Sequence, residues 1–375
     1  MDFVKFGVIG LGGAWQFHKP FFINNSKAKL ISVYDIDIKK SKRTAKFFNA
    51  DYYGSLQDFF NSDIDAVLIL VPHYLHKKFV ISAAQEGKHI LCEKPMAILL
   101  EDCDEMIRAA NKAGVKFMVA ENHRFLPAHN YIFDIIKKGL IGDIFLIRAY
   151  EGVYEVPALM KPESWKGHPI MAGGGALMDM GVHKFAVLNW ILNDHINKAF
   201  AWITKQCTNL KEKAEDNAMI FLKYNKGTIA EITISFTVVS EITNSLEIYG
   251  TNGTILENHM WKNPIKIQSF HKEMGKNKGK WFEPYVEHGP FPKYYLISAK
   301  NEDEHFTNCI LKNEKPDFDP KESREAIADA LLCYLSVKNG KSTTMNEFLE
   351  VYNKEGTISI LDGLEKFVQN NYNLI

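Results

Sequence analysis

The chain has 375 residues, of which 46% are hydrophobic and 24% charged, an ordinary globular composition with enough length for two domains. Its 45 Lys and Arg residues balance 45 Asp and Glu residues, so no excess of positive charge predicts a nucleic-acid partner. No uncharged apolar run reaches transmembrane length, and the opening "MDFVKFGVIGLGG" lacks the features of a signal peptide. We therefore expect a cytoplasmic protein that binds no membrane.

Apolar runs rich in Val, Ile and Phe alternate with amphipathic segments over the first 122 residues. The runs predict strands at 3–10, 28–35, 65–72, 88–95 and 115–122. The segments between them predict helices at 37–48, 73–87 and 100–114. Continuously apolar strands are buried on both faces, which is typical of a parallel sheet with right-handed crossovers. We expect a doubly wound, dinucleotide-binding Rossmann domain over residues 1–122.

The turn after the first strand carries a glycine motif, and its residues are Gly10, Leu11, Gly12, Gly13, Ala14 and Trp15. The first glycine permits a tight turn, and the second lets a pyrophosphate approach the backbone at the start of a helix. The sixth position of G-x-G-x-x-G is Trp15 rather than Gly or Ala. Two interpretations of Trp15 stay open: a core aromatic, or a ring that turns toward the ligand.

Asp35 ends the second predicted strand, where a carboxylate can accept hydrogen bonds from a ribose 2′-hydroxyl and would repel a 2′-phosphate. The next residue is Ile36 rather than an arginine that could bind such a phosphate. This pattern favours NAD over NADP. Basic residues on the following helix keep NADP possible, although a solvated helix face explains most of them; they are Lys39, Lys40, Lys42 and Arg43.

Residues 123–375 predict a second α/β domain with a C-terminal extension from about residue 343. Runs with β-branched residues and partial alternation predict strands at 143–153, 198–206, 217–224, 227–238, 244–250 and 253–257. Gly227 and Gly253 mark hairpin turns. Residues 323–340 predict an amphipathic helix, and the extension also has a helical pattern, for which the sequence offers no function.

The stretch "GGGALMDMGVH" at 173–183 combines three glycines with an acid and a histidine. Asp179 and His183 lie four residues apart and would share a face if the segment is helical. Gly173 to Gly175 would allow a close approach to the backbone that a side chain would obstruct. This arrangement is suited to orienting a histidine beside a ligand.

The motifs together resemble the glucose-fructose oxidoreductase and inositol dehydrogenase family, also called Gfo/Idh/MocA, over residues 3 to about 340. The resemblance is carried, in order, by "GVIGLGG", "VPHYLH", "AAQEGKHILCEKPMA", "ENHRFLPA", "GLIGDI", "GGGALMDMGVH" and "LEIYGTNGTI". It implies a Rossmann domain followed by an α/β domain with a large open, mostly antiparallel sheet. It also implies a homodimer or homotetramer formed through that sheet.

The resemblance further implies an NAD(P)-dependent oxidoreductase whose catalytic residues are Lys94, Asp179 and His183, meeting across a cleft. Hydride transfer from an alcohol needs a base for the hydroxyl proton, and His183 suits that role because its ordinary pKa is near neutral. Asp179 would fix the tautomer of His183 or bind the substrate hydroxyl. Lys94, in the Glu93-Lys94-Pro95 triplet, would stabilise the developing alkoxide. The alternatives are a surface lysine, a helix-surface acid and a capping or buried histidine.

Further cofactor contacts are expected after the third, fourth and fifth strands, at Val71, Pro72, His73, His76, Glu93 and Asn122. His76 fits a helix surface equally well. Arg124 is a candidate substrate contact, with an interdomain ion pair as its alternative. Trp165 and Lys166 match a Trp-Arg pair of the family, but lysine cannot form a bidentate phosphate clamp. Tyr154 and Trp165 are candidates for stacking on a sugar ring, and simple packing remains open for both.

Five cysteines, with no C-x-x-C pair, predict free and mostly buried thiols in a reducing compartment. The scattered histidines predict no metal site. The expected substrate is a sugar, sugar derivative or cyclitol. Two other functions on this fold stay open: an NAD-dependent glycosidase or lyase with transient oxidation, and a non-catalytic dinucleotide sensor.

Overall fold

The computed structural model describes residues 2–161, 164–166, 168–205, 214–240 and 243–364. These residues form two compact units. The first unit contains the chain up to Phe125 together with Tyr295–Arg324, and the second contains Leu126–Tyr294 together with the chain from Glu325 on. The sequence places a single boundary at residue 122 and assigns 295–324 to the second domain. The structure divides the chain differently because this segment completes the first core, where Phe306 packs against Phe6 with ring centroids 6.5 Å apart.

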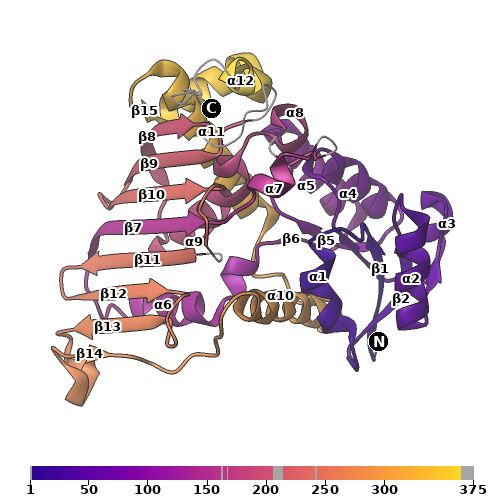
Figure 1. The fold of residues 1–375 in the computed structure, drawn as a ribbon, viewed down its shortest axis with the longest axis horizontal. Coiled ribbons are helices and arrows are strands. Elements are labelled where there is room, and N and C mark those ends of the chain that lie inside the picture. The colour runs from indigo at the N-terminus through magenta and orange to yellow at the C-terminus, as the bar shows by residue number, and fades with distance from the viewer. Residues whose placement is uncertain (1, 162–163, 167, 206–213, 241–242, 365–375) are drawn as a thin grey trace. The chain divides into compact units, whose positions relative to one another are not determined.

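A six-stranded parallel sheet forms the centre of the first unit, with strand order β3-β2-β1-β4-β5-β6 (Figure 1). Its strands are β1 (Val4–Ile9), β2 (Ala28–Tyr34), β3 (Asp51–Tyr52), β4 (Ala66–Ile69), β5 (His89–Glu93) and β6 (Phe117–Ala120). Strands β4 and β6 are buried at every position, as expected for strands covered on both faces. The predicted Rossmann architecture is confirmed.

Helices connect the strands of this sheet. They are α1 (Trp15–His18), α2 (Ile38–Phe48), α3 (Leu56–Phe60), α4 (His76–Gln85) and α5 (Leu100–Ala113), with 3₁₀ turns at Lys19–Phe22, His73–Leu75 and Asn122–Phe125. The side chain of Asp37 caps α2, as the sequence predicts, by accepting a hydrogen bond from the Lys39 amide. Helix α10 (Lys293–Leu311) supplies most of the returning segment.

A nine-stranded sheet forms the second unit, with order β14-β13-β12-β11-β7-β10-β9-β8-β15 (Figure 1). Its strands are β7 (Ile144–Gly152), β8 (Ile196–Thr204), β9 (Asn217–Tyr224), β10 (Ile229–Ser235), β11 (Thr243–Gly250), β12 (Gly253–Asn258), β13 (Ile265–Ser269), β14 (Trp281–Phe282) and β15 (Thr343–Thr344). Strands β7 and β10 pair in parallel, and the other neighbours pair antiparallel. The predicted mixed sheet is confirmed.

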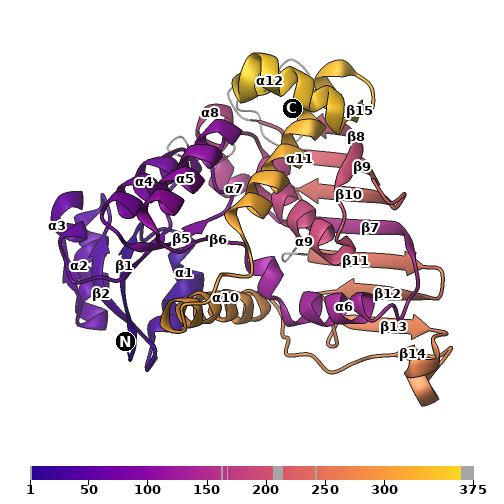
Figure 2. The same ribbon diagram turned by 180° about the vertical axis from the view of Figure 1, so that it is seen from behind.

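Helices cover one face of this sheet, including α6 (Pro127–Lys137) and α9 (Val182–Leu192), as Figure 2 shows from behind. The remaining helices that involve this unit are α7 (Val156–Leu159), α8 (Pro169–Ala172), α11 (Pro320–Asn339) and α12 (Met345–Leu361), with a 3₁₀ turn at Lys272–Asn277. Helix α12 lies in the predicted helical extension and begins with a capping box between Thr344 and Glu347. Residues 365–375 of that extension lie outside the described residues.

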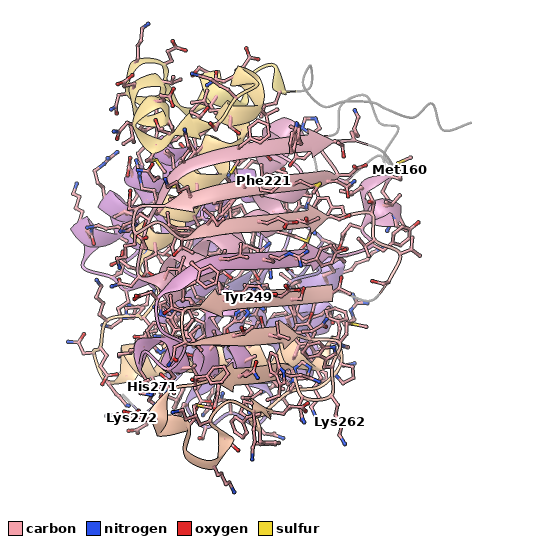
Figure 3. All side chains as sticks on the ribbon, turned by 90° about the vertical axis from the view of Figure 1, so that its left-hand side faces the viewer. Met160, Phe221, Tyr249, Lys262, His271 and Lys272 are labelled. Carbon is pink, nitrogen blue, oxygen red and sulfur yellow. The ribbon has the colours of Figure 1, made fainter. Side chains whose placement is uncertain are left out.

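The other face of the nine-stranded sheet carries the exposed Phe221 and the half-buried Tyr249 (Figure 3). Strand β9 alternates strictly between buried and exposed positions. Four cysteines are free and buried, as predicted, namely Cys92, Cys103, Cys309 and Cys333, whereas Cys207 lies outside the described residues. Within the described part of the chain, no helix is both long and apolar enough to cross a bilayer.

Candidate active site

The glycine turn after β1 has the geometry that the sequence predicts for a dinucleotide loop. Gly10 has φ 93°, and a Cβ there would lie 2.5 Å from the Leu70 carbonyl oxygen, so only glycine fits. By contrast, a Cβ on Gly12 or Gly13 would meet nothing within 4 Å. The fold therefore leaves space beside these two glycines, and the cofactor contacts expected there stay predictions.

Trp15 is a core aromatic, which is the first of its two interpretations. Its side chain is 3% exposed and packs against Phe22 and Phe48, with ring centroids 6.0 and 5.9 Å away. The ring thus fills the core below the loop where the fingerprint usually has a small residue. Helix α1 is correspondingly short, since it gives way to a 3₁₀ turn after four residues.

Asp35 is tied to the glycine turn. One carboxylate oxygen accepts a 2.6 Å hydrogen bond from the Leu11 amide, and the other accepts a 2.7 Å bond from the Asp37 amide. The end of β2 and the loop after β1 are therefore held together by this one side chain. Each carboxylate oxygen retains a further acceptor position. The neighbouring Ile36 is 98% exposed and brings no charge to the site.

The buried side chain of His76, the first residue of α4, holds the loop after β4 in place. His76 is fully buried, and its two ring nitrogens lie 2.9 Å from the carbonyl oxygens of Val71 and Pro95. Burial lowers its pKa, although both carbonyls oppose that shift. The ring therefore links the segment 71–73 to the segment that carries Lys94. The helix-surface interpretation of His76 is wrong, and the cofactor contacts expected at Val71, Pro72 and His73 stay predictions.

Glu93 and Lys94 belong to a buried charge network that the sequence does not reveal. Glu93 accepts a hydrogen bond from the Lys94 amide at 3.1 Å and lies 3.2 Å from His18 Nε2. The other ring nitrogen of His18 lies 2.9 Å from Asp303 on α10. Burial opposes a charge on His18, but Asp303 and Glu93 outweigh it and raise the pKa of His18 well above its usual value. An imidazolium between two carboxylates thus positions the backbone at Lys94.

The residues expected after β6 make contacts within the first unit. The side-chain amide of Asn122 donates a 2.9 Å hydrogen bond to the Ser298 hydroxyl on α10. Arg124 lies 3.6 Å from Glu322, so the ion-pair alternative describes its contact, although the pair lies inside one unit rather than between domains. A substrate contact by Arg124 and a cofactor contact by Asn122 stay predictions.

In the second unit, Asp179 and His183 lie on one continuous helical segment. Asp179 belongs to a π-helical turn (Leu177–Gly181), which leads directly into α9 and its second residue, His183. Both side chains are buried. Single π-helical turns inside helices occur frequently at functional sites.

Lys166 is the partner that the structure gives to Asp179. Its ammonium lies 3.0 Å from Asp179 and 3.7 Å from Glu155, and it stands over the ring of Phe236 at 5.3 Å. Burial opposes the charge on Lys166, but the two carboxylates outweigh it and raise its pKa. The sequence places Lys166 beside the cofactor, whereas the structure shows it neutralising the predicted catalytic acid. Trp165 is half-buried, and Tyr154 is exposed.

The glycine run before Asp179 packs against protein. A Cβ on Gly175 would lie 2.8 Å from the Glu215 carbonyl carbon and closer still to its oxygen, and a Cβ on Gly174 would collide with Tyr334. The Glu215 carboxylate accepts hydrogen bonds from the amides of Gly175 and Leu177, both at 3.0 Å, and from the Tyr334 hydroxyl at 2.7 Å. The close approach predicted from the glycines is therefore an internal one that anchors the π-helical turn.

These features define a protein with a dinucleotide-type glycine turn in one unit and, in the other, a buried acid and histidine with a half-buried lysine. Residues 4–121 match the model of the oxidoreductase family with an NAD-binding Rossmann fold, and residues 129–256 match the GFO/IDH/MocA C-terminal domain. The chain thus belongs to the Gfo/Idh/MocA family of NAD(P)-dependent oxidoreductases, which act on CH–OH groups.

Individual relatives agree with this assignment. The chain is 34% identical over 217 residues to 1,5-anhydro-D-fructose reductase of Ensifer adhaerens. This match covers 58% of this chain and 64% of the reductase. It is 23% identical over 354 residues to myo-inositol 2-dehydrogenase of Thermotoga maritima, covering 92% of this chain and all of that protein. The fold matches the WlbA dehydrogenase from Bordetella pertussis in complex with NADH and UDP-GlcNAcA at a TM-score of 0.78 and 21% identity, over 92% of this chain and 98% of that one.

Proposed function

We propose that this protein is an NAD-dependent dehydrogenase or reductase for a sugar, sugar derivative or cyclitol. It transfers a hydride between the nicotinamide and a carbon that carries a hydroxyl or keto group. The family supports the reaction class, and the named relatives act on compounds of these kinds. The observation that carries the proposal is the ion pair between the half-buried Lys166 and Asp179, the latter in the π-helical turn that leads into the helix of His183.

Each proposed catalytic residue has one role. His183 accepts the hydroxyl proton as the hydride leaves, and it returns that proton in the reverse direction. Asp179 orients the imidazole and stabilises its charged form, while the ion pair with Lys166 fixes Asp179 in position. Lys94 donates a hydrogen bond to the reacting oxygen and stabilises its developing charge. The His18 network supports this role because it holds the adjoining Glu93.

NAD is the proposed cofactor. The open space at Gly12 and Gly13 suits a pyrophosphate, and the Asp35 carboxylate, fixed by the Leu11 amide, suits a ribose 2′-hydroxyl. A 2′-phosphate would meet the negative charge of Asp35, and the exposed Ile36 offers nothing to offset it. When bound, the nicotinamide supplies the hydride chemistry.

A second copy of the chain is the proposed partner of the open sheet face. An aromatic cluster lies across β8 and β9, where Trp202 contacts Phe200 and Phe221 with ring centroids 4.5 and 6.0 Å away. Next to it, Arg148 lies between Glu231 and Glu247. Exposed apolar surface with a charged border is typical of protein interfaces. The four buried free thiols support the expected cytoplasmic location, where such thiols stay reduced.

The test is a purified-protein assay with a panel of sugars and cyclitols, monitoring NADH formation, and with the corresponding ketones, monitoring its consumption. Turnover with at least one compound, abolished by His183→Ala, is the expected result. Release of a leaving group without net NADH would instead identify the glycosidase or lyase chemistry. Tight NAD binding with no turnover on any compound would identify a dinucleotide sensor.

A further inference from the structure

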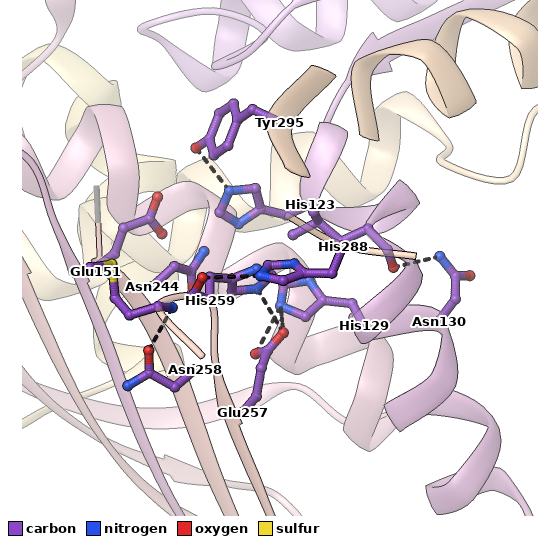
Figure 4. A network of polar contacts seen from close by, with 12 residues as sticks. His123, His129, Asn130, Glu151, Asn244, Glu257, Asn258, His259, His288 and Tyr295 are labelled. Carbon is purple, nitrogen blue, oxygen red and sulfur yellow. Dashed lines mark hydrogen bonds and ion pairs between the residues drawn. The ribbon is translucent and has the colours of Figure 1, made fainter. Parts of the chain in front are cut away.

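A second group of ionisable side chains lies in the nine-stranded sheet unit, formed by His129, Glu257 and His259 (Figure 4). Glu257 belongs to β12, His259 follows two residues later, and His129 lies in the first turn of α6. All three side chains are at most 2% exposed. None of them belongs to the catalytic set or the cofactor turn proposed above.

Glu257 occupies a position where the sheet otherwise buries aliphatic side chains. It points toward the core, and its register partners on the two neighbouring strands are Leu246 and Ile265, both buried. A carboxylate in such a row loses its hydration, and that loss must be compensated by charge or hydrogen bonding. The imidazole rings of His129 and His259 are the polar groups that face this carboxylate. A carboxylate in this position is suited to serve as an anionic ligand.

Both imidazoles present Nε2 to this carboxylate. His259 Nε2 lies 2.8 Å from Oε1, and His129 Nε2 lies 3.2 Å from each of the two oxygens. A ring nitrogen at equal distance from both oxygens leaves both of them directed at the imidazole, as two oxygens that chelate one ion would be. The ligand atoms of the three residues all lie within 4.8 Å of one another.

The rings are held in place by their surroundings. His259 stacks on Tyr294 with ring centroids 4.5 Å apart, and its backbone amide donates a 3.0 Å hydrogen bond to Asn244 on the neighbouring strand. His288 Nε2 faces the His259 carbonyl oxygen at 3.1 Å and not the Glu257 carboxylate. Packing thus orients His259, and His288 lies beside the group without entering it.

We propose that His129, Glu257 and His259 bind one structural Zn²⁺ ion, with two imidazole nitrogens and a bidentate carboxylate as ligands. This donor set is one that zinc prefers. Tetrahedral coordination at zinc bond lengths separates ligand atoms by about 3.4 Å. The observed 2.8 and 3.2 Å separations reach that value with small ring movements. The ion fastens the start of α6 to the end of β12, two elements more than 100 residues apart in the chain.

Metal analysis of the purified protein tests the proposal. After reconstitution with zinc and removal of the excess by gel filtration, about one equivalent per chain is expected. Cobalt in place of zinc is expected to give the visible absorption bands of a tetrahedral ion. At a hundredfold excess of free zinc over Kd, the melting temperature is expected to exceed that of the chelator-treated protein by about 5–10 °C.

Substitutions test whether the ion is bound by these three residues. Glu257→Gln and His129→Gln are expected to lose the bound metal, whereas the matched control His288→Gln keeps it. A wild-type chain that takes up less than about 0.1 equivalent, with an unchanged melting temperature, overturns the proposal and leaves a hydrogen-bonded His-Glu-His group. Stoichiometric metal that persists in Glu257→Gln overturns it too, since the ion would then lie elsewhere. The wild-type measurements decide the matter even if a variant fails to fold.

Discussion

Replacing Gly175 by alanine tests whether the glycine run is a structural device rather than a ligand loop. The added Cβ would lie 2.8 Å from the Glu215 carbonyl carbon and overlap its oxygen, so the backbone must move. Overpacking of this kind costs about 1–3 kcal/mol. The movement also strains the bond from Gly175 to the Glu215 carboxylate and the 3.1 Å bond from the Ala176 amide to the Glu215 carbonyl, each contributing about 1 kcal/mol. We expect a total loss of about 3–5 kcal/mol.

Thermal unfolding of the purified protein measures this loss. For a unit of this size, 3–5 kcal/mol corresponds to a decrease of roughly 6–20 °C in melting temperature. The matched control is Gly12→Ala, whose Cβ meets nothing within 4 Å. It should leave the melting temperature nearly unchanged but weaken NAD binding about tenfold or more, which calorimetric titration can measure. A Gly175→Ala protein that melts within about 2 °C of wild type would refute the reasoning.

Substitutions at three further positions probe the charges of the two units. Lys166→Met should reduce kcat/KM about 10- to 100-fold because Asp179 loses its 3.0 Å ion pair. Lys166→Arg should retain most activity. Equal activity in the wild type and both variants would contradict the proposed role. Asp35→Asn keeps the hydrogen bond from the Leu11 amide but removes the negative charge. The ratio of kcat/KM for NAD over NADP should therefore fall about tenfold. An unchanged ratio would contradict the proposed role of Asp35 in selecting NAD. Burial raises the pKa of Glu215 to about 7, so its contribution to stability is present below about pH 4.5 and is lost as pH rises toward 7. Glu215→Gln should flatten that part of the melting-temperature profile, whereas a parallel profile would show that another group is responsible.

The sequence predicts the features of this fold that depend on local pattern. Buried strands, the turn at Gly10 and the hairpins at Gly227 and Gly253 follow from apolar runs and glycine positions, and the structure contains all of them. The sequence also indicates that something approaches the backbone at Gly175, but not that the neighbour is Glu215, a residue 40 positions away.

Contacts between distant residues could not be predicted in this way. His18 and Asp303 are 285 positions apart, and no spacing rule relates them. Lys166 has the position of a family arginine, and this resemblance gave no indication of its ion pair with Asp179, while its cofactor contact stays a prediction. The Glu-x-His pattern at 257–259 would place both side chains on one face of a strand, but two residues are too few to indicate a metal ligand. Such pairings exist only once the sheet and helices have assembled.

The return of α10 to the first unit has a consequence for biosynthesis. The N-terminal strands leave the ribosome long before Phe306 and Asp303, which fill their core and pair with His18. At 5–20 residues per second, translation of the intervening segment 126–294 takes roughly 10–35 s. During that interval the nascent Rossmann sheet lacks one of its own helices, and the apolar surface around Phe6 that Phe306 later covers stays exposed.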